Sequence, residues 1–158
     1  MPGLDSINNL AVKLALRPDA RTADVNGLAI DTKGYDSLAF TLAVGVIQEV
    51  LSDGVMDFTA TIQKSATAAF TTAVTLGESE VFDKDGTLGT GATATVFDIH
   101  DNADDDTAYS VGVKIDPDYR YYRVVSNFTG TFTYAIDYCI LAILSHGDMP
   151  DDSIEMNP

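Results

Sequence analysis

The sequence of 158 residues is poor in cysteine, tryptophan and basic residues. It has one cysteine, no tryptophan, and 9 Lys and Arg against 24 Asp and Glu, for a net charge of −15. A single cysteine excludes a disulfide framework and a thiolate metal cluster within one chain. Nucleic-acid binders need clustered basic residues, and an anionic membrane repels an acidic surface. We therefore expect no nucleic-acid partner and no membrane partner.

Long apolar segments are also missing. The longest wholly apolar run, Tyr138–Leu144, has seven residues, whereas a membrane-spanning helix needs roughly 20. The first residues, Met1–Asp5, lack the basic start and apolar stretch of a secretory signal, so we expect synthesis in a cytoplasm. With 46% hydrophobic residues, the chain is too apolar for a disordered acidic protein, and its length fits one domain.

Aspartate, threonine and glycine are abundant. The chain has 20 Asp against 4 Glu, with 17 Thr and 12 Gly. Asp and Gly favour turns, whereas Glu favours helices. The composition therefore indicates a fold rich in strands and turns.

Apolar residues recur at every second position in four segments, which is typical of β-strands. In Leu38–Val46 the residues between the large apolar ones are all small, so we expect this strand to be covered on both sides. Its large residues are Leu38, Phe40, Leu42, Val44 and Val46. The same period occurs in Phe58–Gln63, Val111–Ile115 and Thr131–Leu144. The last segment becomes apolar on both faces, which predicts a central strand.

Turn signals separate these segments. Asn26-Gly27 predicts a β-hairpin, Asp53-Gly54 and Asp85-Gly86 predict further reversals, and Asp116-Pro117-Asp118 predicts a turn before Tyr119. About eight or nine short strands between such turns predict an all-β fold, an antiparallel β-sandwich or jelly roll.

We expect one β-sandwich domain over residues 1–145. Its residues 1–20 are an N-terminal arm or a short helix, because the apolar spacing of Ser6–Leu16 suits a helix. Residues 146–158 contain two Pro, four acids and no Lys or Arg. Their composition predicts an extended acidic C-terminal tail, either disordered or laid along a neighbouring subunit.

Residues of the kind used in nucleophilic catalysis are few. The histidines are His100 and His146, and Cys139 lies in an apolar strand where a free thiol usually packs as a small hydrophobe. The sequence has no Gly-x-Ser-x-Gly elbow, no His-Glu-x-x-His pair and no phosphate-binding glycine loop. We therefore predict that the protein is not an enzyme and has no cofactor.

Two acidic segments are weak candidates for a metal site. Asp83 and Asp85 belong to an Asp-x-Asp-Gly sequence, and Asp104 and Asp106 belong to the densest acidic run. Calcium prefers such carboxylate oxygens, but the distal Glu of an EF-hand is missing. A solvated acidic loop is the simpler interpretation, and structural calcium is the alternative.

The aromatic and basic run over residues 119–123 is the most unusual local feature. Tyr and Arg are enriched in protein interfaces, because they combine large contact area with directed hydrogen bonds. The alternative is an intramolecular role, in which Arg120 or Arg123 neutralises nearby aspartates. The candidate interface residues are Tyr119, Arg120, Tyr121, Tyr122 and Arg123, together with Leu38, Phe40 and Leu42 of the two-sided strand.

Several segments resemble small virion proteins encoded near the capsid genes of tailed bacteriophages. These segments are Ala29–Leu38 leading into Phe40–Gly45, then Phe58–Ser65, Tyr121–Val125 and Ala142–Gly147. They occur in the expected order over most of the chain. One departure is Ala66-Thr67-Ala68-Ala69, where related sequences often have an Asp-Gly turn.

The resemblance implies a non-enzymatic head decoration or cement protein that binds the capsid exterior. Its partners would be the major capsid protein and further copies of itself, with a trimer favoured by threefold lattice points. The alternatives are a carbohydrate- or receptor-binding sandwich module of a phage tail or fibre, with Tyr119, Tyr121 and Tyr122 as a stacking platform, and a head–tail component. An acidic outward surface would limit aggregation between particles.

Overall fold

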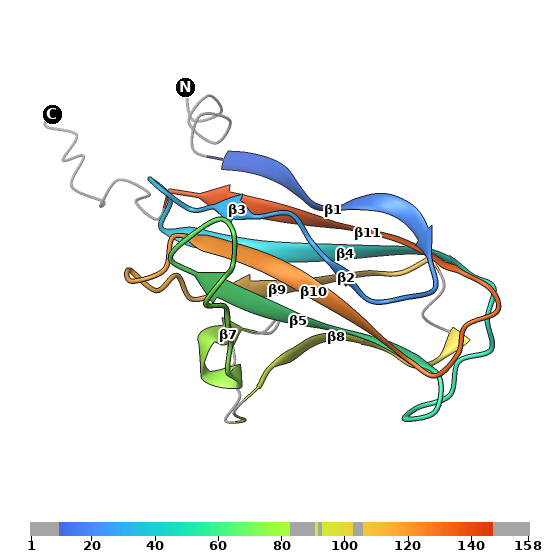
Figure 1. The fold of residues 1–158 in the computed structure, drawn as a ribbon. Helices are drawn as coiled ribbons and strands as arrows, with labels where there is room; N and C mark the ends of the chain where they lie inside the picture. Colours follow the sequence, from blue (N-terminus) through green and yellow to red (C-terminus); the bar gives the residue numbers. More distant parts are fainter. Residues whose placement is uncertain (1–9, 83–90, 92, 103–105, 147–158) are drawn as a thin grey trace, which may run out of the picture.

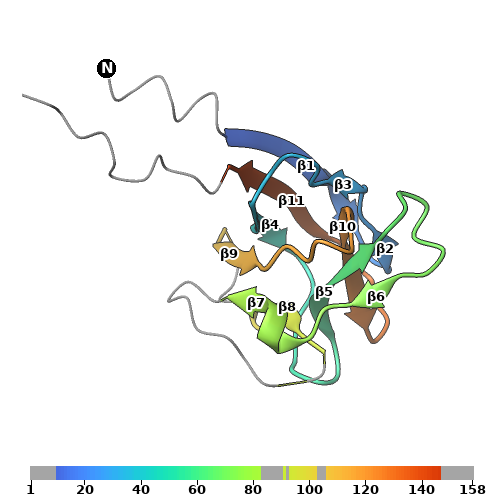
Figure 2. The ribbon, with the colours of Figure 1, turned by 90° about the vertical axis from the view of Figure 1, so that its left-hand side faces the viewer.

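The computed structural model describes residues 10–82, 91, 93–102 and 106–146. These residues form two antiparallel β-sheets that pack face to face (Figures 1 and 2). The prediction of an all-β sandwich is confirmed. The described residues contain eleven strands rather than eight or nine, because several two-residue strands add to the long ones.

The first sheet has five strands in the order β1-β11-β4-β9-β7. Its strands are β1 (Leu10–Arg21), β11 (Ile136–Ser145), β4 (Ser37–Ile47), β9 (Ala108–Val113) and β7 (Val81–Phe82). The strand β11 lies between β1 and β4, so the predicted central position of the last apolar segment is confirmed.

The second sheet has six strands, with the path β2-β10-β5-β6; β3 also pairs with β10, and β8 with β5. Its strands are β2 (Val25–Asn26), β3 (Ile30–Asp31), β10 (Tyr121–Thr129), β5 (Asp57–Ser65), β6 (Val74–Thr75) and β8 (Thr95–Ile99). A short 3₁₀ helix, η1 (Glu78–Glu80), precedes β7.

The core lies between the two sheets. The fully buried large side chains include Phe40 and Leu42 of β4, Phe58 and Ile62 of β5, and Ile140 of β11. Alternation along each strand delivers these side chains to one face, as period-two patterning requires.

A polar link joins the sheets inside this core. The Tyr138 hydroxyl donates to Ser126 Oγ at 2.8 Å, and Ser126 Oγ donates to the Val25 carbonyl at 3.2 Å. Burial raises the pKa of Tyr138 to about 12. The hydroxyl is therefore a hydrogen-bond donor at physiological pH, and it ties β11 to β10 and β2.

The predicted helix over Ser6–Leu16 is wrong for Leu10–Leu16, which belongs to β1. The reason is a register shift between Leu14 and Leu16 against β11, which buries the consecutive residues Ala15 and Leu16. Two adjacent buried positions break the period of two and imitate helical spacing. Residues 1–9 and the predicted tail from residue 147 onward lie outside the described residues.

A second bulge corrects the predicted face of Val46. The pairing of β11 with β4 shifts between Ile136 and Tyr138, so that Ile136 faces Ile47 and Tyr138 faces Val44. The extra residue on β4 turns Val46 to the exterior, where it is 48% exposed, and buries Ile47 instead. The predicted strand over Thr131–Leu144 also starts late, at Ile136, because the N–H groups of Thr133 and Tyr134 donate to the Glu49 carboxylate in a loop.

The predicted hairpin at Asn26-Gly27 is wrong. The segment from β2 to β3 runs straight along the edge of the sandwich and contacts both sheets. The Gly27 N–H donates to the Val124 carbonyl of β10 and the Leu28 N–H donates to the Ala15 carbonyl of β1, each at 2.7 Å. A Cβ atom on Gly27 would lie 2.7 Å from the Ala15 oxygen and 2.8 Å from the Val124 oxygen. Glycine is required for this close approach, not for a turn.

Two other turn predictions are confirmed. Gly54 has a positive φ of 69° in the reversal where the Met56 N–H donates to the Ser52 carbonyl. The Tyr119 N–H donates to the Asp116 carbonyl at 3.0 Å, which closes the turn around Pro117. The Asp85-Gly86 reversal lies outside the described residues.

We predict that Gly27→Ala destabilises the protein by about 2 kcal/mol, because backbone atoms of two strands must move to admit one methyl group. Urea unfolding measures this loss. Asn26→Ala is the control, since Asn26 is an exposed neighbour in the same segment, and it should change stability by less than about 0.5 kcal/mol. Equal stability of Gly27→Ala and the wild type would contradict the close approach.

Candidate interaction surfaces

Four of the predicted interface residues lie in the core. Leu38, Phe40 and Leu42 are at most 2% exposed, and Tyr122 is fully buried. They cannot contact a partner, so their predicted role is corrected to packing. The prediction chose the larger residues of β4, but the sandwich interior takes these residues and leaves the small ones outside.

Tyr122 helps to hold a partly buried ion cluster at one end of the sandwich. Its hydroxyl oxygen accepts the Asp116 N–H at 2.7 Å. Lys64 is 6% exposed, and its Nζ donates to Glu80 Oε1 and Asp116 Oδ2, both at 2.6 Å. The same Nζ lies 4.6 Å from the centre of the Tyr119 ring. One cation therefore joins β5, η1 and the turn before β10.

The ion cluster shifts the pKa values of its members. Burial alone would lower the pKa of Lys64, but its hydrogen bonds to Asp116 and Glu80 outweigh burial and hold that pKa above its usual range. The hydrogen bonds from Lys64 and from the Asp118 N–H hold the pKa of the Asp116 carboxyl below its usual range. Both shifts stabilise the charged forms, as expected of a paired and hydrogen-bonded cluster.

The two arginines of the aromatic and basic run are engaged within the molecule. Arg120 donates to Asp31 through Nε at 2.8 Å and Nη2 at 2.6 Å, and its guanidinium lies 5.2 Å from the Tyr121 ring centre. The hydrogen bond from Arg120 lowers the pKa of Asp31 to about 2. Arg123 donates to Gln63 Oε1 from Nε and Nη2 and covers the Phe70 ring at 4.4 Å. Arg120 therefore neutralises an aspartate, Asp31, within the same chain, as the alternative prediction stated.

The exterior of the five-stranded sheet is a larger and different surface. We call outer face the uncharged outward residues of β1, β11, β4, β9 and β7. They are Leu10, Val12, Leu14, Cys139, Leu141, Ile143, Ser145, Ser37, Ala39, Thr41, Ala43, Gly45, Ala108, Ser110, Gly112 and Phe82. The outer face ends at charged residues, because Asp137 has the same outward register on β11 and Arg17 and Asp19 are exposed on β1. Leu10, Val12 and Leu14 are 43% to 58% exposed.

Strand pairing arranges the outer face in rows. Val12 pairs with Ile143, Ile143 with Ala39, and Ala39 with Gly112. The next row runs from Leu14 through Leu141 and Thr41 to Ser110. Each row falls from large side chains on β1 and β11 to small ones on β4 and β9, and the large Phe82 of β7 lies beside Gly112 at the end of the first row. The two halves of the outer face therefore form a ridge and a trough.

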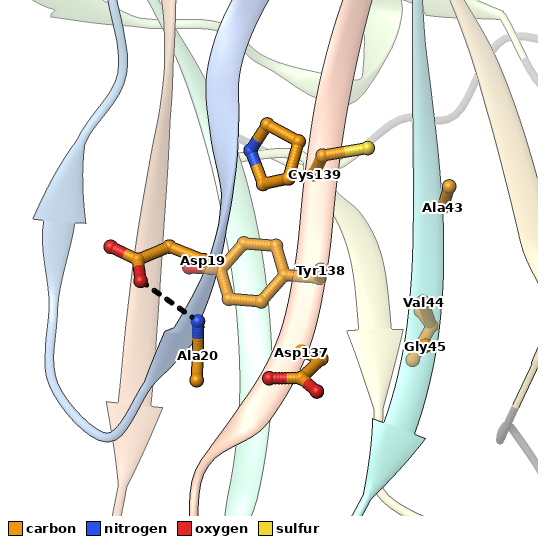
Figure 3. A pocket seen from close by; sticks show the side chains of 9 residues that line it. Asp19, Ala20, Ala43, Val44, Gly45, Asp137, Tyr138 and Cys139 are labelled. Atoms are coloured by element: carbon orange, nitrogen blue, oxygen red, sulfur yellow. Dashed lines mark hydrogen bonds between the residues drawn. The ribbon is translucent and has the colours of Figure 1, made fainter.

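A shallow hollow lies at the far end of the outer face (Figure 3). Its volume is about 460 Å³, and its lining includes Ala43 and Gly45 of β4, Cys139 of β11, and Pro18 and Ala20 of β1. The hollow exists because Ala and Gly fill little space between β1 and β4. Asp19 and Asp137 are its acidic lining residues, and Asp19 Oδ1 accepts the Ala20 N–H at 3.0 Å.

The metal candidates are mostly untested. Asp83, Asp85 and Asp104 lie outside the described residues, and Asp106 is an exposed residue at the end of a loop, with a φ of 54°. Among the residues that the structure describes, no three His, Cys, Asp or Glu side chains gather as a metal site would require. His100 Nδ1 lies 3.3 Å from Asp98 Oδ1, and the His146 ring stacks on Tyr35 at 4.9 Å.

In the same part of the chain, no helix has the length and apolarity needed to cross a membrane. A scan against protein-family models finds no match for this chain, and no curated protein matches its sequence.

Sequence reasoning missed the outer face as a surface. One half of the signal was visible, because the small residues between Leu38 and Val46 predicted a strand covered on both sides. The other half was the alternation of Leu10, Val12 and Leu14, which the bulge at Ala15 disguised as helical spacing. The β4 residues that face outward are Ala39, Thr41 and Ala43, whereas their larger neighbours face the core.

We predict that Asp116→Asn lowers stability by about 1 kcal/mol at pH 7, because one charge-assisted hydrogen bond at a partly exposed site is lost. The pKa of Asp116 is lowered from 3.8 in the folded state. The Asp116 carboxylate therefore adds to the stability of the fold above about pH 3.8. This stabilisation is lost as the pH falls through the lowered pKa of the folded state. Urea unfolding of the variant should consequently depend less on pH between neutral and acid.

The matched control is Asp118→Asn, an exposed acid of the same turn. We expect its stability to follow that of the wild type at each pH. If Asp116→Asn and Asp118→Asn show the same pH dependence, Asp116 has no special role in holding Lys64.

Proposed function

We propose that this protein is a structural, non-enzymatic component of a virion, which binds the outside of a tailed-phage head as a decoration or cement protein and stabilises capsomer contacts. It would be made in the host cytoplasm and would reside on the capsid exterior. Its partners would be the major capsid protein and other copies of itself.

The single observation that carries this proposal is the uncharged outer face of a protein with a net charge of −15. Contiguous apolar surface of a few hundred Å² on an otherwise polar protein marks a site that another protein covers. The outer face is built on paired strands of one sheet and not on a loop. It therefore supports a permanent role in an assembly better than a transient one.

The distribution of the other groups supports the same role. The candidate arginines are engaged by Asp31 and Gln63 within the chain, and the acids Asp19 and Asp137 border the outer face only at its far end. Uncharged contact surface combined with acidic exterior surface favours specific assembly and limits aggregation between particles. The resemblance of five segments to small virion proteins is the reason for proposing a phage head as the location of the protein.

The receptor- or carbohydrate-binding alternative is less well supported. A stacking platform of Tyr119, Tyr121 and Tyr122 needs three bare rings, but Tyr122 is buried. The Lys64 ammonium lies over the Tyr119 ring, and the Arg120 guanidinium lies over the Tyr121 ring. The rings are therefore used inside this chain.

The test is binding of the purified protein to heads assembled from the major capsid protein of the same phage without this chain. We expect saturable co-sedimentation at a fixed number of copies per capsomer, and heads that withstand higher temperatures before they open. An unrelated protein of similar charge and size controls for non-specific uptake. Heads that take up no more of this chain than of the control would overturn the proposal.

A glycan array separates the alternative. A decoration protein should bind heads and leave the array blank. Specific glycan binding without head binding would support a tail or fibre module instead.

A further inference from the structure

The hollow at the far end of the outer face combines apolar walls with an outward carboxylate (Figure 3). Its walls include Pro18, Ala43 and Cys139, and its volume is about 460 Å³. Pockets of roughly 300–1,000 Å³ hold small molecules, so a single long side chain of another protein fits. The carboxylate belongs to Asp137 of β11, which has the same outward register as Cys139.

Asp137 stands between two of the smallest residues of the sheet. It pairs with Ala20 of β1. On the other side, a Cβ atom on Gly45 of β4 would lie 3.3 Å from the Cβ atom of Asp137. Neither neighbour can cover the carboxylate or donate a side-chain hydrogen bond to it. Asp137 is nevertheless partly buried, because the strands on both sides remove part of its contact with water.

The Asp137 carboxylate differs from the other sheltered acids in having no partner. Among the described residues, it makes no ion pair and accepts no hydrogen bond. Every other acid in that part of the chain that is buried or partly buried accepts a hydrogen bond from the chain. These acids are Asp31, Glu49, Asp57, Glu78, Glu80 and Asp116. A sheltered charge without a partner is costly, and a cation from outside would remove that cost.

The second acid of the hollow is already engaged. Asp19 Oδ1 accepts the Ala20 N–H at 3.0 Å, and Asp19 Oδ2 lies 3.6 Å from Arg21 Nη1. Arg21 Nη2 in turn donates to the Arg17 carbonyl at 3.1 Å. The Arg17 side chain is exposed, and Arg17 lies about 10 Å before Ala20 along β1. The charge that lacks a partner in the hollow is therefore that of Asp137.

We propose that this hollow is the docking site for an arginine side chain of the protein that this chain binds, with Asp137 as its counter-ion. A guanidinium group donates two parallel hydrogen bonds to one carboxylate, and neither oxygen of Asp137 is engaged by another described residue. The aliphatic part of the arginine covers Ala20, Ala43 and Gly45. The inference rests on the proposed function for the identity of the partner, which is the major capsid protein.

Charge selects a cation over other occupants. The chain carries −15, and its field raises the local concentration of cations. An anionic side chain would be repelled by Asp137, and an apolar one would leave the carboxylate buried and unpaired. An arginine matches both the apolar walls and the carboxylate, and arginine is enriched in protein interfaces.

The first test uses Nα-acetyl-arginine methylamide as the probe and the backbone amide NMR signals of the full chain as the readout. We expect saturable shifts at Ala20, Gly45 and Cys139 with a Kd on the order of 10 mM, since one side chain buries little area. Nα-acetyl-citrulline methylamide has a similar shape without the charge, and we expect no such shifts from it. Equal shifts with both probes would overturn the proposal. So would no shifts at the hollow, as expected if Arg17 already supplies the cation.

The second test assigns the binding to Asp137. Asp137→Asn keeps the shape of the side chain and removes its charge, and we expect it to abolish the saturable shifts. Asp118→Asn has the same net charge and should keep them. Asp118 is exposed and follows β9, whose Val113 pairs with Leu38 at the opposite end of β4 from the hollow. The NMR spectra also check that both variants fold. Unchanged binding of the arginine probe to folded Asp137→Asn would overturn the proposal.

Binding to heads tests whether the same site serves the partner. We expect Asp137→Asn to weaken binding of the chain to heads about tenfold, because one sheltered ion pair is lost. The affinity of this variant should also depend less on salt concentration than that of the wild type. Asp118→Asn should bind heads as the wild type does.

The outcomes separate this inference from the proposed function. If the wild type binds heads and Asp137→Asn binds them equally well, the arginine contact is overturned and the decoration role remains. If the wild type binds the arginine probe but no heads, the decoration role is overturned and the arginine site remains.

Discussion

The constraint on which the structure depends is that β4, the middle strand of the five-stranded sheet, is free of charge on both faces. One face of β4 carries Phe40 and Leu42 into the core, and the other carries Ala39, Thr41 and Ala43 into the outer face. When water covers one side of such a strand, apolar area stays exposed, which is unfavourable for the free energy of the folded state. The fold satisfies the inner face with the second sheet. No second layer covers the outer face among the described residues, and the proposed contact with a partner rests on this asymmetry.

The charged groups are organised around the same asymmetry. The buried Lys64 is balanced by Glu80 and Asp116 at one end of the sandwich, and Arg120 is balanced by Asp31 on the exterior of the six-stranded sheet. Removing Lys64 would leave the Glu80 and Asp116 carboxylates without their shared cation, which is costly where charges are partly buried. The cluster therefore fixes the turn before β10 and the start of that strand. Lys64 and Arg120 thus each tie acidic residues of different segments to the sandwich.

The sequence predicted the strands well where alternation was unbroken, as in Leu38–Val44 and Phe58–Gln63. It failed where a bulge inserted one residue, at Ala15 and near Val46, because one extra residue exchanges the two faces of everything beyond it. It also failed at Asn26-Gly27, where the glycine serves a close approach between backbones that only the assembled sheets create. The candidate surface was half predictable: two-sided coverage was visible in the small residues of β4, but size alone could not tell which of its faces points inward.

The acids of the exterior limit where this chain can make an apolar contact. The exterior of the six-stranded sheet carries Asp31, Asp98 and the engaged arginines, and Asp19 and Asp137 border the far end of the outer face. The apolar side chains of a partner that meets the uncharged rows of β1, β11 and β4 avoid these acids, and its proposed arginine pairs with Asp137 where the rows end. Repulsion between copies that each carry −15 opposes contact through the acidic parts of the surface. The net charge thereby confines apolar contact to one part of one sheet.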